Sequence, residues 1–86
     1  MATYLCNYGQ YRFFIRPERR MVLFYLGGYN KNNYIITELP EGFAWKGISE
    51  LFSSGNEGKI SDLERKLSEI ADKIVGETKK NSYADN

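Results

Sequence analysis

The chain has 86 residues, enough for one domain with a single modest core. Its 12 Lys and Arg residues nearly balance 11 Asp and Glu residues, and the net charge of +1 argues against a whole-molecule electrostatic grip on nucleic acid or a membrane. The absence of histidine removes the commonest general base and the commonest transition-metal ligand. The single cysteine, Cys6, excludes an intramolecular disulfide, and from the lack of a signal-peptide pattern or a stretch of membrane-spanning length we expect neither segment. We therefore expect a cytoplasmic protein that does not enter a membrane.

The first predicted element is a short strand over residues 3–7, where apolar and polar side chains alternate weakly. Tyr8, Gly9 and Gln10 then predict a turn or a bulge before the next strand. One long strand that continues through these three residues fits the same pattern. The sequence leaves both arrangements open.

The densest run of β-branched and aromatic residues, over residues 11–26, predicts a β-hairpin. Pro17 cannot donate to a strand ladder, so it suits the first position of the connection. We predict that Arg16 faces Met21 across the connection. Because side chains alternate along a strand, this register places three wholly apolar pairs on one face. These pairs are Ile15 with Val22, Phe13 with Phe24 and Tyr11 with Leu26.

The opposite face of this hairpin mixes arginines with large apolar side chains. Exposed aromatic rings on a sheet stack on unpaired bases, and arginines hold phosphates. The alternatives are that the C-terminal helices lie across this face, or that a second copy of the protein covers it in a homodimer. The candidate residues for binding single-stranded nucleic acid or a nucleotide are Arg12, Phe14, Arg16 and Tyr25.

Residues 27–33 predict a loop between antiparallel strands, because they are rich in types that tolerate positive φ. A strand over residues 34–39 follows. Tyr29 and Lys31 would then lie at a protruding tip of the kind that contacts other proteins. Successive backbone N–H groups of the loop could also cradle an anion, although the loop matches neither common phosphate-binding fingerprint.

Two helices are predicted next, a short one over residues 48–53 and a long one that begins at Ser61. Ser61 and Glu64 have the spacing of a capping box, and Gly76 suits the end of a helix. These boundaries divide the chain into a domain over residues 1–76 and a polar, disordered tail over residues 77–86. The long helix has an apolar stripe that either covers the sheet or forms a helix-mediated homodimer. The stripe consists of Ile60, Leu63, Leu67, Ile70 and Ile74.

The predicted fold class is α+β, with a small antiparallel meander of three to four strands followed by a short helix and a longer C-terminal amphipathic helix. We expect the longer helix to pack on the apolar face of the hairpin, because an antiparallel sheet needs a cover on at least one side. That face consists of Tyr11, Phe13, Ile15, Val22 and Phe24.

No catalytic, metal-binding or phosphate-binding motif is found in the sequence, so we expect a non-enzyme without a cofactor. Cys6 has no histidine to activate it and is expected to be a small buried hydrophobe. Basic residues predominate in residues 1–33, which hold five Lys and Arg residues and one acid, Glu18. Among them, Arg19 and Arg20 form either a solvated turn or a contact with an acidic partner.

Two functions fit these observations. The first is a small protein-binding module, an adaptor or inhibitor that docks on a larger protein through Arg19, Arg20, Tyr29 and Lys31. A surplus of Tyr, Arg and Asn at predicted loop tips, together with the lack of catalytic chemistry, favours it. The alternative is binding of single-stranded nucleic acid or a nucleotide through the mixed face of the hairpin. The identity of the partner is open, and a homodimer is compatible with either function.

Overall fold

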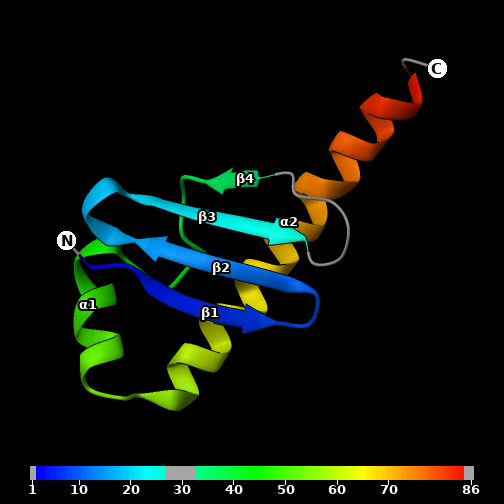
Figure 1. Ribbon diagram of the computed structural model, residues 1–86. Coiled ribbons are helices and arrows are strands. Elements are labelled where there is room, and N and C mark those ends of the chain that lie inside the picture. The colour runs from blue at the N-terminus through cyan, green and yellow to red at the C-terminus, as the bar shows by residue number, and fades with distance from the viewer. Residues whose placement is uncertain (1, 27–32, 85–86) are drawn as a thin grey trace.

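The computed structural model of the protein describes residues 2–26 and 33–84. In chain order the elements are β1 (Tyr4–Tyr8), β2 (Tyr11–Arg16), the short 3₁₀ helix η1 (Pro17–Arg19), β3 (Met21–Leu26), β4 (Asn33–Ile36), α1 (Trp45–Ser53) and α2 (Glu57–Ala84). The strands form one antiparallel sheet in the order β1-β2-β3-β4, and both helices lie on the same side of it (Figure 1). This arrangement confirms the predicted α+β fold with a four-stranded meander.

The segment before the hairpin is a separate strand, which decides between the two arrangements that the sequence left open. β1 pairs antiparallel with β2, and its last residue, Tyr8, lies opposite Tyr11. The turn between them consists of Gly9 and Gln10, and Gly9 has a φ of +58°. Glycine adopts this left-handed conformation without the steric cost that a Cβ atom imposes. The predicted strand over residues 3–7 is therefore present, with bounds one residue later at each end, because Thr3 precedes it and Tyr8 belongs to it instead of to the turn.

The hairpin of β2 and β3 has the predicted register in all four pairs, including Phe13 opposite Phe24. The rings of these two residues lie 5.6 Å apart. Pro17 begins the connection, as predicted, and is buried. Arg20 ends the connection in the left-handed region, with a φ of 52°, and its N–H donates to the Pro17 carbonyl at 3.1 Å.

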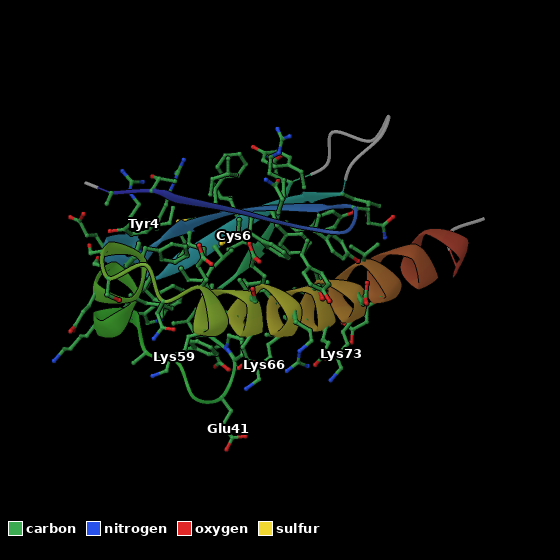
Figure 2. All side chains as sticks on the ribbon, turned by 90° about the horizontal axis from the view of Figure 1, so that it is seen from below. Tyr4, Cys6, Glu41, Lys59, Lys66 and Lys73 are labelled. Atoms are coloured by element: carbon green, nitrogen blue, oxygen red, sulfur yellow. The ribbon has the colours of Figure 1, made fainter. Side chains whose placement is uncertain are left out.

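The core lies between the sheet and α2. Figure 2 shows Cys6 between the two layers, whereas Lys59, Lys66 and Lys73 point away from the sheet on the outer side of the helix. The predicted covered face is confirmed, because all five of its residues are buried. The core is built from Tyr11, Phe13, Ile15, Val22 and Phe24 of the hairpin, Cys6, Ile36 and Ile48, and Leu63, Leu67, Ala71 and Val75 of α2.

Two tyrosines join the sheet to the helices. The Tyr11 hydroxyl donates a hydrogen bond to Asp72 Oδ1 of α2 at 2.5 Å. Burial of Tyr11 and this bond raise its pKa to about 12, so the hydroxyl keeps its proton at neutral pH. The ring of Tyr4 stacks on Phe52 of α1, with centroids 4.6 Å apart and planes inclined by 12°.

The predicted ends of α2 are wrong. The helix begins at Glu57 because the Ile60 N–H already donates to the Asn56 carbonyl at 3.0 Å, so Ser61 lies inside the helix. Asn56, also a favoured N-cap type, precedes the first turn. The helix continues through Gly76 to Ala84. Glycine ends a helix when it adopts positive φ, and Gly76 does not.

The division into a domain over residues 1–76 and a disordered tail over residues 77–86 stays a prediction, although the structure is helical as far as Ala84. The last turns of α2 extend beyond the sheet (Figure 1). The stripe of α2 covers the sheet, with Leu63 and Leu67 buried and the three isoleucines partly buried. The first of the two predicted uses of the stripe, covering the sheet, is therefore the one that the structure shows.

The segment between the last strand and α1 also differs from the prediction. β4 ends at Ile36 instead of residue 39, and α1 begins at Trp45 instead of residue 48. Leu39 packs against the core and Pro40 is buried, so this stretch is apolar because it closes the core and not because it extends the sheet. Apolar composition alone does not distinguish these two uses.

Two substitutions test this division between core and surface. Leu67→Ala and Leu5→Ala remove the same atoms, from a fully buried position in α2 and from a position in β1 that is 54% exposed. We expect Leu67→Ala to lower the free energy of unfolding by about 2–5 kcal/mol and Leu5→Ala by less than about 1 kcal/mol. Urea unfolding followed by circular dichroism measures both. Equal losses would contradict the arrangement.

Candidate functional site: the open face of the sheet

The face of the sheet opposite the helices carries one large apolar side chain from each strand, side by side. Leu5 lies opposite Phe14, Phe14 opposite Leu23, and Leu23 opposite Ile35. We call these four residues the apolar row. Its outer members, Leu5 and Ile35, are 54% and 51% exposed, and the inner two are half-buried. No described helix or strand lies over this open face (Figure 2).

One side of the apolar row is flanked by an arginine and a tyrosine. Arg12 lies opposite Tyr25 in the hairpin and opposite Asn7 in β1. The Arg12 Nε–H donates to Asn7 Oδ1 at 3.3 Å, which orients the guanidinium across the face. The ring of Phe14 meets that of Tyr25 edge-on, with centroids 5.6 Å apart. Arginine and aromatic side chains thus form one continuous surface beside the row.

A cleft of about 250 Å³ lies on the other side of the apolar row. Arg16, which pairs with Met21, and Arg19 of η1 both line it, and we call it the basic cleft. The Arg16 Nε–H is buried and has no hydrogen-bond partner among the described residues. A buried donor without a partner costs about 1–3 kcal/mol, so this atom favours an added acceptor. The remaining lining residues are Ala2, Thr3 and Glu18, and the Glu18 carboxylate accepts the Ala2 N–H at 3.1 Å.

The structure brings the predicted nucleic-acid residues together on the open face. Arg12, Phe14, Arg16 and Tyr25 all lie there. The expectation that the C-terminal helices cover this face is wrong, because α1 and α2 both pack on the opposite face, where the larger apolar set lies (Figure 1).

The structure describes two of the four predicted protein-binding residues. Arg19 lies at the basic cleft beside Arg16, and Arg20 is exposed at the end of η1. Tyr29 and Lys31, and most of the loop proposed as an anion cradle, lie outside the described residues.

Sequence reasoning missed the outer members of the apolar row. Leu5 and Ile35 are each adjacent to a core residue, Cys6 and Ile36 respectively. When consecutive residues of a strand are both apolar, one of them must face away from the core. That pattern is visible in the sequence, but placing Leu5 beside Phe14 also requires the register of β1 against β2.

A second cleft, of about 390 Å³, lies between the 42–44 segment, α1 and the first turns of α2. Two lysines, Lys59 and Lys66, line it together with Asp62. The Lys66 ammonium lies 3.3 Å from Asp62 and 5.6 Å from the centroid of the Phe43 ring, and it donates to the Glu41 carbonyl at 3.4 Å. Lys66 is therefore already engaged, unlike the Arg16 Nε–H at the basic cleft.

Cys6 is 2% exposed, as expected for a small buried hydrophobe. Burial, and secondarily the nearby carboxylate of Glu64, raise the pKa of its thiol to about 12. Within residues 2–26 and 33–84 there is no group of three or more Cys, Asp and Glu side chains that could hold a metal ion. None of the helices in the described part of the chain is long and apolar enough to span a membrane.

Comparison with protein-family models, curated proteins and solved structures found no match to this chain. The proposals below therefore depend on the residues and their geometry.

The Cys6 thiol gives a test of the core that is independent of function. At about pH 8 its raised pKa keeps it protonated, and burial blocks access to it. We expect the folded chain to react with a maleimide at least about 100-fold more slowly than the chain in concentrated urea, where the pKa returns to an ordinary value. Mass spectrometry of timed samples measures both rates. Similar rates would show that β1 does not seal the core.

Proposed function

We propose that this protein is a non-catalytic protein-binding module, an adaptor or inhibitor that docks on a larger protein through the open face of its sheet. The observation that carries the proposal is the apolar row, in which Leu5 and Ile35 are each more than half exposed. Contiguous exposed apolar surface bordered by polar groups is typical of binding sites, because leaving it in water is unfavourable. Covering the row with a partner removes that cost.

The basic residues and the tyrosine around the row support the same proposal. Interfaces are enriched in Arg, Tyr and other aromatic residues, which supply large contact areas and several hydrogen bonds. Arg12 and Tyr25 border one side of the row, and Arg16 with Arg19 borders the other. Tyr29 and Lys31 stay predicted contacts of the same module.

Absence of catalysis and a cytoplasmic location are part of the proposal. The chain has no histidine, and its one thiol is buried with a pKa raised to about 12, so the usual nucleophile and general base are not provided. A single unpaired cysteine suits a reducing compartment.

Binding of single-stranded nucleic acid is the second candidate, and the proximity of Arg12, Phe14 and Tyr25 favours it. Two features favour protein binding over nucleic-acid binding at this face. The row also contains the aliphatic Leu5 and Ile35, which do not stack on bases as aromatic rings do. Phe14 meets Tyr25 edge-on, so the two rings do not form one flat stacking platform.

The test is capture of a partner from an extract of the source cell with the tagged chain. We expect one stoichiometric protein, whose capture falls at least about tenfold when Leu5→Ser and Ile35→Thr are combined, because two exposed apolar contacts are lost. Both side chains face solvent in the free protein, so the variant should fold normally, which circular dichroism checks.

The matched control is Tyr8→Ser, since Tyr8 is another exposed apolar side chain, at 41%, but lies outside the row. Capture unaffected by the double variant would contradict the proposal. So would tight binding of a dT oligonucleotide that weakens steeply between low and physiological salt, because that dependence signals release of counterions from phosphates.

A further inference from the structure

We infer that the partner presents an acidic side chain to the basic cleft between Arg16 and Arg19, and a large apolar side chain of the same segment to the apolar row. This inference rests on the proposed function and adds the chemistry of the partner. The partner segment is thus acidic and apolar, with both features within one short stretch of its chain.

Charge on the sheet is the first argument. Within the four strands as described, the charged residues are Arg12 and Arg16, and both lie on the open face. The face therefore carries positive charge with no carboxylate among its strand residues. A partner with Asp or Glu side chains complements it, whereas a basic partner would be repelled.

The unsatisfied donor of Arg16 is the second argument. Arg16 lines the cleft together with Arg19, and its buried Nε–H lacks a partner among the described residues. Guanidinium groups bind carboxylates through two parallel N–H···O bonds, which is the geometry that an Nε–H and a terminal N–H provide together. The volume of about 250 Å³ equals that of about eight water molecules, which leaves room for a carboxylate.

Glu18 lines the same cleft but does not remove its charge. Its carboxylate accepts the Ala2 N–H at 3.1 Å, and it is the single acid among the described lining residues beside two arginines. The cleft therefore has a net positive lining that one further carboxylate would neutralise.

The distance between the basic cleft and the apolar row determines how far apart the acidic and the apolar residue lie in the partner segment. Arg16 lies two residues beyond Phe14 on the same face of β2, which is about 7 Å along the strand. An extended segment spans this distance between residues i and i+2. A helix spans a similar distance between residues i and i+3 or i+4. An acidic residue two to four positions from a large apolar one therefore fits the surface.

A second copy of the chain fits the open face less well. Two copies placed face to face would each contribute Arg12 and Arg16, and no carboxylate from their strands. A short acidic segment of a partner supplies the carboxylate that a second copy lacks.

The experiment selects peptides of about 12 random residues, displayed on phage, against the immobilised full chain. We expect enrichment of Asp or Glu two to four residues from Leu, Ile or Phe. For the best peptide, Arg16→Gln with Arg19→Gln should weaken the dissociation constant at least about tenfold, since two charge-assisted contacts are lost. Arg16→Lys should weaken it as well, because lysine lacks the Nε–H.

The matched control is Lys59→Gln with Lys73→Gln, which removes two positive charges from the outer side of α2 (Figure 2) and should change the affinity less than about twofold. Peptides without acidic enrichment that still require Leu5 and Ile35 would overturn this inference and leave the proposed function standing. Peptides insensitive to Leu5→Ser with Ile35→Thr would overturn both. Stronger binding of a dT oligonucleotide, or dimers by light scattering that Leu5→Ser dissolves, would also overturn the inference.

Discussion

Burial of one face of the sheet under α2 holds the two layers of the protein together. Phe13 and Phe24 face each other across the hairpin and lie fully buried beneath Leu63 and Leu67. Fully burying a side chain of this size contributes about 1.5–3 kcal/mol, and no other layer of the described chain supplies comparable burial. The sheet and its helix are therefore stable only together.

Alternation of side chains makes the open face a direct consequence of this burial. Once Phe13 and Ile15 point to the helix, Phe14 must point away from it. The one long helix in residues 2–26 and 33–84, α2, packs on the other side of the sheet. Leu5 and Ile35 stay more than half exposed on this face, and that exposure is what supports the proposal of a partner. The same alternation places Arg16 beside the row.

The local parts of this fold were predictable from the sequence. The length of the connection determines the hairpin register, in which Phe13 pairs with Phe24. Apolar residues that recur every three or four positions determine which side of α2 faces the sheet. Two features depend on distant contacts and were left open or missed, namely the separate pairing of β1 and the absence of a described helix over the mixed face. The ends of α2 were also predicted wrongly, for local reasons. Ser61 has the spacing of a capping box, but the helix begins earlier, directly after Asn56. Both are favoured N-cap residue types, so the residue types alone do not identify the first turn.

The apolar row is exposed in the free protein, while its neighbours are sealed in the core. Methyl NMR spectra of the full chain, recorded with a soluble paramagnetic agent, test this difference residue by residue. The structure predicts strong broadening for the methyl groups of Leu5 and Ile35 and little for those of Val22 and Leu67, which are fully buried. Equal protection of all four residues would show that the open face is covered and would contradict the account.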